Sequence, residues 1–527
     1  MVNVRAVPFG YESDPEASAS PLPRLLGVDE RVDGTDDLPD GWVWTTIGQA
    51  CELNPPKPPV DTLPSGGRVS FVSMPAVDAD SGEIVDAAER VYADVRGGYT
   101  VFADGDVIMA KITPCMENGK AAIARGLTNG LAAGSSEFHV LRPNGVALAE
   151  YLFHFIRQPS FRRIAEENMT GSVGQRRVPA SFLDAAAIPI PPLAEQRRIA
   201  EAVEALLAQV DAARARLEHA EAVVKRFRQA ILAAACSGKL TEDWRALNPI
   251  LDEAHRFLDE PHGKRHESSI TSQWASRDDP GLPDTWDVVT IGQLARVGTG
   301  ATPLKKRSDY YEGGTVPWVT SGAVNDRTIV RAREHITELA LRATNAKVFP
   351  AGTLLVAMYG EGATRGKVAE LAIPAATNQA LAALTFDGPA ARYKAFVRLF
   401  LEKNYEETRE ASLGGVQPNL SLGLIKNMPI PLPPPMEQDE IVQRVEALFG
   451  LADKLEARIR AARARVDALP QAILTRAFSG KLVPTEAELA RREGRIYEPA
   501  SVLLERIEAE RAARGASTAR KGRRGRA

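Results

Sequence analysis

Basic, amide and hydroxyl side chains gather in a few short stretches of this 527-residue sequence. Lysine and arginine suit contacts with phosphate, whereas Gln, Asn and Arg can make paired hydrogen bonds to purine edges. A single basic residue more often belongs to a solvated surface, so the prediction of nucleic-acid contacts rests on the clusters. The candidates are Lys111, Lys120, Arg125, Gln175 and Arg176 in the first half, and Lys305, Lys306, Arg307, Tyr310, Thr320, Ser321, Arg365, Lys367, Gln417 and Asn419 in the second.

Motifs for catalysis are incomplete. Residues 54–57 read Asn-Pro-Pro-Lys, with lysine in place of the aromatic residue that stacks on a flipped base in N6-adenine methyltransferases, and no Phe-x-Gly-x-Gly loop for S-adenosylmethionine is present. Residues 362–368 lack the spacing and the Ser/Thr of a P-loop, and predict a turn that presents Arg365 and Lys367. Many restriction nucleases place Asp or Glu two residues before a catalytic lysine. No lysine of this sequence has Asp or Glu at that position. We therefore predict that the chain is not itself an enzyme.

The composition argues against several other classes. The net charge of −3 argues against a protein that coats nucleic acid through bulk positive charge, so binding must use local patches. No run of about 18 apolar residues could span a membrane, and the first residues lack a secretory pattern. The three cysteines lie too far apart to indicate disulfides or a zinc site. His255, His262 and His266 are interpreted as solvated, with a metal site as the alternative. We expect a soluble protein of the bacterial cytoplasm.

The sequence contains an internal duplication. Residues 38–49 (LPDGWVWTTIGQ) return as residues 282–293 (LPDTWDVVTIGQ), with eight of the twelve positions identical. Pro-rich segments that end in Glu-Gln and Ser-Gly-Lys-Leu segments also repeat, at an offset of 242: residues 189–196 and 431–438, and residues 237–240 and 479–482. The middles of the two copies differ much more than their edges. Repeated edges predict a shared role, and divergent middles predict two different ligands.

Long helices are predicted after the Pro-rich segments, where apolar residues recur at alternating steps of four and three. This pattern is typical of a coiled-coil seam, and an amphipathic helix packed on a globular core is the alternative. The predicted seam positions include Ile199, Val203, Leu206, Val210, Leu217 and Val224, and then Ile441, Val445, Leu448, Leu455, Ile459 and Val466. Pro470 stands where the first copy has Arg228, and is expected to kink or restart the helix. If the ends of each head lie close together, the helices run antiparallel and act as a spacer about 50 Å long.

These patterns predict an α+β fold with two globular mixed α/β heads, separated by a long antiparallel two-helix coiled coil with an internal pseudo-twofold repeat. Strands are predicted at residues 69–74, 106–110, 315–320 and 353–357, and helices at residues 149–168 and 391–411. The predicted parts are a poorly ordered extension (1–37), the first head (38–190), the first spacer helix (191–243), a polar linker (244–281), the second head (282–432), the second spacer helix (433–485), and a C-terminal helix with a basic, disordered tail (486–527).

The order of these motifs resembles the specificity (S) subunit of type I restriction-modification systems over about residues 38–485. The two LPD-x-W…TIGQ segments look like the starts of that family's target recognition domains. Residues 301–322 are similar to its G-x-TP…Y-x-GG…PW segment, and residues 105–123 and 352–369 to its mid-domain strand and loop. The segments PIPPLAEQRRI, PLPPPMEQDEI and SGKL resemble its helix boundaries.

The resemblance implies a non-catalytic reader of double-stranded DNA. Each head would read one half of a bipartite target, and the helices would fix the spacing. Two modification (methyltransferase) subunits would dock on the helical regions, and restriction subunits would join to form the methyltransferase and ATP-dependent endonuclease. No cofactor is expected in this chain; S-adenosylmethionine, ATP and Mg²⁺ are expected on the partner subunits. The alternatives are a self-sufficient DNA modification enzyme and a coiled-coil scaffold that does not read DNA.

Overall fold

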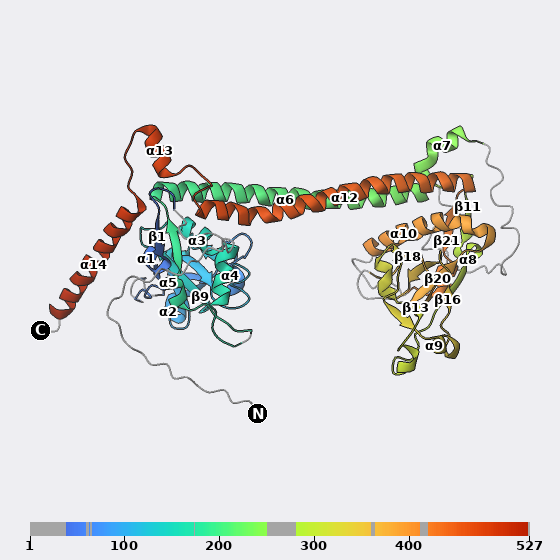
Figure 1. The fold of residues 1–527 in the computed structure, drawn as a ribbon, viewed down its shortest axis with the longest axis horizontal. Helices are drawn as coiled ribbons and strands as arrows, with labels where there is room; N and C mark the ends of the chain where they lie inside the picture. Colours follow the sequence, from blue (N-terminus) through green and yellow to red (C-terminus); the bar gives the residue numbers. More distant parts are fainter. Residues whose placement is uncertain are drawn as a thin grey trace, which may run out of the picture. The chain divides into compact units, whose positions relative to one another are not determined.

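The protein is described by a computed structural model that covers residues 38–59, 63, 66–172, 174–249, 281–359, 364–411 and 420–524. The chain divides into two compact units, Met1–Ala215 with Arg463–Ala527, and Arg216–Ala462. Each unit combines one head with parts of both long helices, α6 (Leu193–Cys236) and α12 (Pro435–Phe478) (Figure 1). The predicted extension 1–37, the three linker histidines, Gln417 and Asn419 lie outside the described residues.

The first head contains two four-stranded sheets and a short strand pair that joins its two ends. In the pair, β1 (Val43–Thr46) runs antiparallel to β10 (Ala187–Ile190). One sheet has the antiparallel order β2 (Cys51–Leu53), β9 (Phe138–Pro143), β6 (Val107–Ala110), β7 (Ala121–Ile123). The other has the order β4 (Ala88–Val91), β3 (Arg68–Val72), β8 (Leu131–Gly134), β5 (Thr100–Ala103), with β3 and β8 parallel. Its α-helices are α1 (Ile47–Ala50), α2 (Tyr92–Val95), α3 (Ala149–Ile156), α4 (Pro159–Glu167) and α5 (Ala180–Ala185).

The second head repeats this plan with different strand lengths and order. The strand pair is β11 (Asp287–Thr290) and β21 (Pro429–Leu432). A five-stranded sheet has the order β12 (Arg296–Thr299), β20 (Leu381–Thr385), β17 (Leu354–Ala357), β18 (Val368–Leu371), β14 (Thr328–Ile329). A four-stranded sheet has the order β15 (Glu334–Ile336), β13 (Val316–Val319), β19 (Ala375–Thr377), β16 (Val348–Phe349). Its α-helices are α8 (Ile291–Leu294), α9 (Glu338–Ala343), α10 (Lys394–Ala411) and α11 (Leu422–Lys426).

The predicted strands coincide with β3, β6, β13 and β17, and α10 with the second predicted helix. Both β6 and β17 are buried along their whole length, which is why they read as continuous apolar runs. The helix predicted over residues 149–168 is instead two helices, α3 and α4. The break falls at Gln158, whose backbone is not helical, because Pro159 cannot continue a helix but suits the first turn of the next one.

The two long helices run antiparallel within each unit. In the first unit, Arg198 pairs with Glu486 just beyond α12, and Arg214 pairs with Asp467 at 3.0 Å. In the second unit, Arg228 bridges to Glu456 at 3.0 Å, and Arg444 pairs with Asp243 just beyond α6. In both units, the further along the first copy a residue lies, the earlier in the second copy its partner lies. The antiparallel prediction is therefore confirmed.

Burial of the seam varies along the helices. Val203, Val210, Ile441 and Val445 are buried, whereas Leu455 is exposed. The buried positions share a hydrophobic core with their head, which covers them in addition to the opposite helix. The core of the second unit includes residues of α10, of its five-stranded sheet and of α12, and α10 lies beneath the helix pair in Figure 1.

Pro470 lies inside α12, which continues without interruption to Phe478, so the expected restart of the helix is wrong. Proline cannot donate a backbone hydrogen bond to the carbonyl four residues earlier, that of Val466. Leu474 and Phe478 on the next turns are buried in the core of the first unit, and this packing holds the helix on the far side of the proline.

The C-terminal segment forms α13 (Glu486–Glu493) and α14 (Ala500–Arg524). Leu503 and Ile507 belong to the core of the first unit, and the Ala500 amide donates to the Gly41 carbonyl at 2.9 Å. Because α14 continues to Arg524, most of the predicted disordered tail is helical. None of the described helices is both long and apolar enough to cross a membrane.

The repeated edge motifs meet in a buried junction in each unit. In the first unit, which we call the Glu195 junction, the Trp42 Nε1 donates to Glu195 Oε1 at 2.9 Å and the Glu486 amide donates to Glu195 Oε2 at 2.7 Å. Gly480 lies against Pro39, where a Cβ would overlap the proline ring. Burial raises the pKa of Glu195 above its ordinary value.

The Glu437 junction of the second unit follows the same plan. Glu437 is fully buried and accepts from Trp286 Nε1 at 2.9 Å, from Thr241 Oγ1 at 2.7 Å and from Arg245. A Cβ on Gly238 would overlap the ring of Pro283. Each junction combines the opening and Glu-Gln segments of one copy with the Ser-Gly-Lys-Leu end of the other. The shared role of these buried residues is therefore to fasten each head to the helix pair.

Candidate nucleic-acid interface

Three of the predicted contact residues come together in the first head. Lys111 directly follows β6, and the chain at Gln175–Val178 runs beside it. The Thr113 amide donates to the Arg176 carbonyl at 3.0 Å, and the Val178 amide donates to the Lys111 carbonyl at 2.8 Å. This pairing places Lys111 beside the segment that carries Gln175 and Arg176, although more than sixty residues separate the two segments in sequence.

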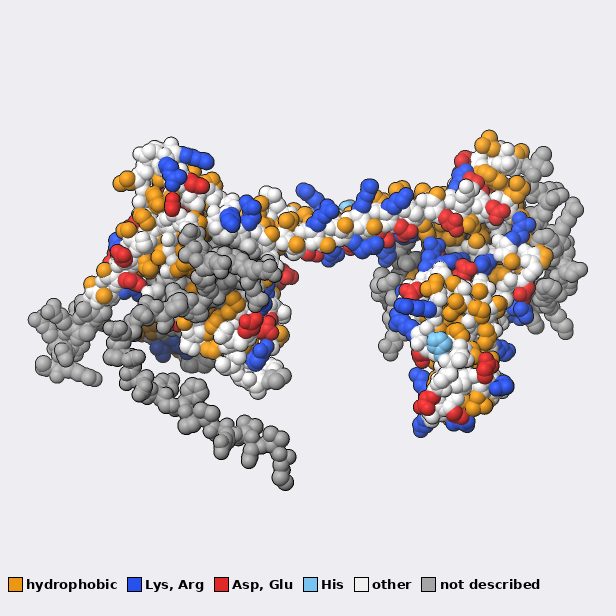
Figure 2. Space-filling view, viewed as in Figure 1, with side chains coloured by type: hydrophobic (Ala, Val, Ile, Leu, Met, Phe, Trp, Pro, Cys, Tyr) orange, Lys and Arg blue, Asp and Glu red, His pale blue; other side chains and the backbone are white. Residues whose placement is uncertain are grey.

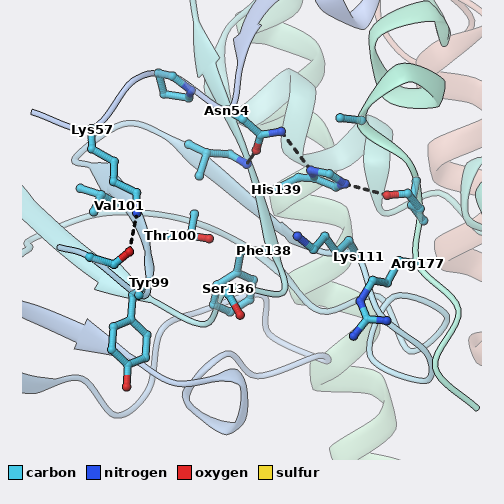
Figure 3. A pocket seen from close by; sticks show the side chains of 16 residues that line it. Asn54, Lys57, Tyr99, Thr100, Val101, Lys111, Ser136, Phe138, His139 and Arg177 are labelled. Atoms are coloured by element: carbon cyan, nitrogen blue, oxygen red, sulfur yellow. Dashed lines mark hydrogen bonds between the residues drawn. The ribbon is translucent and has the colours of Figure 1, made fainter. Parts of the chain in front are cut away.

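These segments border a cleft of about 560 Å³, which we call the Lys111 cleft. It lies where the two four-stranded sheets meet, with Thr100 and the preceding Tyr99 on one side and Phe138 and His139 of the other sheet opposite (Figure 3). Its cationic lining residues are Lys57, Lys111 and Arg177. A cleft with several cations and an aromatic ring suits a polyanion that also presents flat bases.

His139 fixes one wall of the Lys111 cleft. Its Nε2 lies 2.8 Å from the Val178 carbonyl, which can only accept, so this nitrogen carries the proton. Its Nδ1 then accepts from the Asn54 side-chain amide at 3.1 Å (Figure 3). Burial lowers the pKa of His139, which keeps the ring neutral. The histidine therefore holds the segment that carries Gln175–Arg177 against β9.

Asn54 has a structural role. Its side-chain oxygen accepts from the Val140 amide at 3.0 Å while its amide nitrogen contacts His139, so both ends of the side chain are engaged. Its φ of 50° lies in the left-handed region, which asparagine tolerates better than most residues. The Asn-Pro-Pro-Lys segment is a corner that leads out of β2, and Lys57 donates to the Arg96 carbonyl at 2.9 Å.

The charges of the Lys111 cleft are arranged asymmetrically. Arg177 makes three hydrogen bonds to Glu137, at 2.8, 2.9 and 3.2 Å, and this guanidinium lowers the pKa of Glu137. Lys111 also lowers the pKa of Glu137 by its charge, but it makes no ion pair or side-chain hydrogen bond with any residue that the structure describes. Its ammonium group is therefore available to an external anion. Arg176 contacts Glu166 at 3.3 Å on a partly exposed surface, and Gln175 is exposed.

The structure does not bring Lys120 and Arg125 into this group. Lys120 Nζ donates to the carbonyls of Met74 and Val77 at 3.0 and 2.7 Å, so it closes a loop of its own head. Arg125 pairs with Glu150 at the start of α3. Neither residue lines the Lys111 cleft.

In the second head, one predicted group surrounds the short turn at Ser308–Tyr310. Lys305 and Lys306 are exposed, whereas Tyr310 is buried. The Arg307 guanidinium lies 4.5 Å from the centre of the Tyr310 ring and pairs with Asp309 at 2.5 Å. Arg307 is exposed as well but is paired with Asp309, so Lys305 and Lys306 are the cations of this turn without an ion pair among the described residues.

A second group in this head lies at the end of β13. Thr320 and Ser321 begin a short turn that ends at Asn325, and the Asn325 side-chain oxygen accepts from Lys367 at 2.8 Å. Arg365 is half-buried two residues earlier. This bond brings Lys367 next to the end of the turn that Thr320 and Ser321 begin.

On the face seen in Figure 2, basic side chains are spread among acidic ones on the heads and helices, without a continuous basic surface. This distribution agrees with the use of local patches. The sequence reasoning missed His139, Glu137 and Asn54, which hold the Lys111 cleft. Its only signal for them was the Asn-Pro-Pro corner, because the partners of these residues lie far away in sequence.

The chain belongs to the family described as the type I restriction modification DNA specificity domain, whose model matches residues 39–222 and 283–462. The EcoEI specificity subunit of Escherichia coli is 28% identical, with 81% of each chain covered. The EcoKI specificity subunit of Escherichia coli K12 is 31% identical over 72% of this chain and 75% of that protein. The EcoAI specificity subunit of Escherichia coli is 41% identical, but the match spans 34% of this chain and 29% of that protein.

Two solved structures share the fold. A chain from a type I R-M system, in a structure that concerns complex assembly and conformational transition, has a TM-score of 0.64 and 23% identity, with 84% of this chain and 99% of that chain covered. The HsdS subunit from Thermoanaerobacter tengcongensis has a TM-score of 0.51 and 22% identity, with 84% and 98% covered. These matches and the antiparallel helices confirm the predicted fold class.

Proposed function

We propose that this chain is the DNA-recognition subunit of a type I restriction-modification system, and that each head contacts one half of a bipartite double-stranded target. The observation that carries the proposal is the Lys111 cleft. The Lys111 ammonium group and the aromatic Tyr99 line this cleft, and the exposed Gln175 lies on the segment that borders it. Lysine supplies an attraction to phosphate that is independent of sequence, and the amide of Gln175 can discriminate between base edges.

The two heads present different groups around their sheets. The first head uses the Lys111 cleft, whereas the second offers Lys305 and Lys306 on one turn and Thr320, Ser321 and Lys367 at another. Because each head rests on the same kind of junction, this difference favours two unlike half-sites read by equivalent modules. The long helices would then set the distance between the half-sites.

The proposal includes the partners that family membership supports. Two modification subunits would bind the helical regions, restriction subunits would complete the nuclease, and the complex would act in the cytoplasm. S-adenosylmethionine, ATP and Mg²⁺ would be bound by those partner subunits. The chain itself would perform no chemistry, in keeping with the structural role of its Asn-Pro-Pro segment.

The test is to express the chain with its modification subunits and to map methylated adenines across the host genome. The expected result is one bipartite, asymmetric motif with a fixed gap. Replacing residues 38–188 with the first head of another family member should change one half of the motif and leave the other intact. Methylation by the isolated chain, or a motif without two separated halves, would contradict the proposal.

A further inference from the structure

The second unit contains a contact between its head and its helix pair that the two junctions do not account for. Phe449 of α12 is buried, with 6% of its surface exposed. The guanidinium of Arg228, on α6, lies 4.9 Å from the centre of its ring. The guanidinium of Arg327, in the second head, lies 5.3 Å from the same ring. We call these three residues the Phe449 cluster.

Both arginines are held in place by carboxylates. Arg228 pairs with Asp453 and Glu456 of α12 at 2.5 and 3.0 Å. Arg327 makes two hydrogen bonds to Glu402 of α10, at 3.1 and 3.3 Å, which is the paired geometry that a planar guanidinium favours. With both guanidinium groups oriented in this way, they contact one aromatic ring from two different parts of the unit.

The head side of the cluster is braced within the second head. Arg398 of α10 donates to Glu402 at 3.0 Å and to the Arg327 carbonyl at 2.9 Å. Arg398 also contacts Glu370 on β18, which pairs with Lys394 at 2.6 Å. A displacement of Arg327 would therefore disturb both α10 and the five-stranded sheet.

The position of the cluster on α12 gives it a mechanical role. Phe449 lies twelve residues after Glu437, or about 18 Å along the helix at 1.5 Å per residue. The Glu437 junction and the packing of Ile441 and Val445 hold the head near the start of α12, and the Phe449 cluster adds an attachment at that distance from Glu437. Two separated attachments resist rotation of the head about the junction far better than one attachment does.

The cluster also borders the candidate DNA surface. Arg327, Asn325 and Lys367 line the same groove, of about 280 Å³, as Arg228 and Phe449. Lys367 donates to Asn325, two residues before Arg327. The segment that carries Ser321 and Asn325 therefore leads directly to Arg327, which contacts α12.

The equivalent positions of the first unit lack this arrangement. At the offset of 242 that relates the two copies, Leu207 corresponds to Phe449 and Pro470 to Arg228. Both line a groove of about 1050 Å³ between the first head and its helices. Arg157 on the head side lies over Phe153 of its own head, and donates to the carbonyls of Ala79 and Asp80. Among the described residues, this aromatic-guanidinium link between head and helix pair is thus found in the second unit and not at the equivalent positions of the first.

We propose that the Phe449 cluster fixes the orientation of the second head on its helix pair, and thereby the position at which the second half-site must lie. Arg228, Arg327 and Phe449 are positioning residues, which act through the head and do not touch DNA. The effect on target spacing rests on the proposed DNA-recognition function. The effect on the orientation of the head rests on the structure of this unit alone.

The first experiment measures orientation without DNA. Nitroxide labels at Leu304, which is exposed on the second head, and at Lys454, exposed on α12, report the distance between head and helix in the full chain with Cys115→Ser. Phe449→Leu, which installs the residue of the first copy, should broaden the distance distribution. Arg327→Lys, which keeps the charge but loses the planar contact, should broaden it less. Leu451→Ala, at an exposed position on the same helix, is the control and should leave the distribution unchanged.

The second experiment uses the chain assembled with its modification subunits. Methylation is compared on duplexes that carry the two half-sites at the native gap and at gaps longer or shorter by one base pair. Phe449→Leu should keep both half-site sequences and reduce the preference for the native gap about tenfold. Arg327→Lys should reduce it about threefold.

The outcomes separate the two proposals. An unchanged distance distribution and an unchanged gap preference in folded Phe449→Leu and Arg327→Lys variants would overturn the role of the cluster. A broadened distribution with unchanged gap preference would overturn its role in spacing. A wild-type complex without any gap preference would overturn the proposed function, while the distance measurement would still decide the orientation.

Discussion

The two units of this protein have the same junction but different secondary attachments. Glu195 and Glu437 are equivalent carboxylates that accept from equivalent tryptophans. Beyond the junction, the first unit packs Tyr151 and Phe155 on Phe478, with ring centres 5.0 and 5.3 Å apart. The second unit has Cys236 at the position equivalent to Phe478, and makes its aromatic contact at Phe449 instead.

This comparison shows which parts of a duplicated fold are held constant and which are free to diverge. The junction requires a buried carboxylate, an indole donor and a glycine pressed against a proline, so a change in one residue disturbs the others. The secondary attachment requires only that some large side chain of the helix meet the head. Equivalent heads can therefore be fastened at different distances from equivalent junctions.

The largest expected effect concerns the junctions. Glu437→Ala would leave Arg245 without its buried partner, and Trp286 Nε1 and Thr241 Oγ1 without an acceptor. We expect a loss of about 3–5 kcal/mol in the free energy of unfolding. Glu195→Ala leaves an indole and one backbone amide unpaired and should lose roughly 2–4 kcal/mol. Chemical denaturation measures both, with exposed Glu201→Ala as the control. Losses as small as that of the control in both junction variants would show that the junctions do not stabilise their units.

The next effect separates the units by pH. His154 is buried in the first unit, and burial lowers its pKa to about 4, whereas His335 in the second head is exposed. Because the unfolded chain binds a proton near pH 6.5 and the folded chain does not, stability is full above pH 6.5 and falls as the pH decreases toward 4. The loss should be on the order of 3 kcal/mol.

Thermal unfolding followed between pH 7 and pH 4 checks this expectation. The transition of the first unit should move to lower temperature more than that of the second. His154→Phe should flatten this dependence, and His335→Phe should not. A flat profile for the wild-type first unit would mean that the buried imidazole accepts a proton without disturbing the fold.

The third prediction concerns Pro470 and Arg228, which are equivalent at the offset of 242 and line the grooves of the first and second units. Pro470→Ala restores a backbone donor for the Val466 carbonyl and should stabilise the first unit by about 1–3 kcal/mol. Arg228→Ala removes two ion pairs and a contact with Phe449, and should destabilise the second unit by about 1–2 kcal/mol. Unfolding monitored separately for each unit, by intrinsic fluorescence of Trp42 or Trp286 in single-tryptophan backgrounds, distinguishes the two changes. Opposite signs are expected, and a destabilised Pro470→Ala variant would contradict the account of α12.

The smallest expected effect distinguishes Lys111 from Arg125, two cations that the sequence groups as candidate DNA contacts. Lys111→Ala should weaken DNA binding by the assembled complex about three- to tenfold and reduce its salt dependence, because one phosphate contact is lost. Arg125→Ala should leave affinity unchanged, since Arg125 pairs with Glu150 outside the Lys111 cleft. Fluorescence anisotropy at several salt concentrations provides the measurement. A similar loss in both variants would mean that the cleft has no special part in binding.

Much of the fold could be predicted from the sequence because its signals are local or periodic. The 4-3 pattern identified α6 and α12, and runs such as Val107–Ala110 identified buried strands. The duplication identified the equivalent segments, since both copies keep the same residues at the same offset. The sequence could not decide whether Pro470 would kink or restart its helix, because the cost of a missing backbone donor depends on packing around the helix, here at Leu474 and Phe478.

The sequence by itself determined that there are two heads, two long helices and repeated edge segments. The tertiary structure alone decided what those segments contact. It joined Trp42 to Glu195 and Glu486, turned Lys120 toward two carbonyls, and left Lys111 facing a cleft whose other walls come from Asn54, Tyr99 and His139. The physical reason is that a residue's type and spacing define its own strand or helix, whereas its partners are set by the packing of elements far apart in the chain.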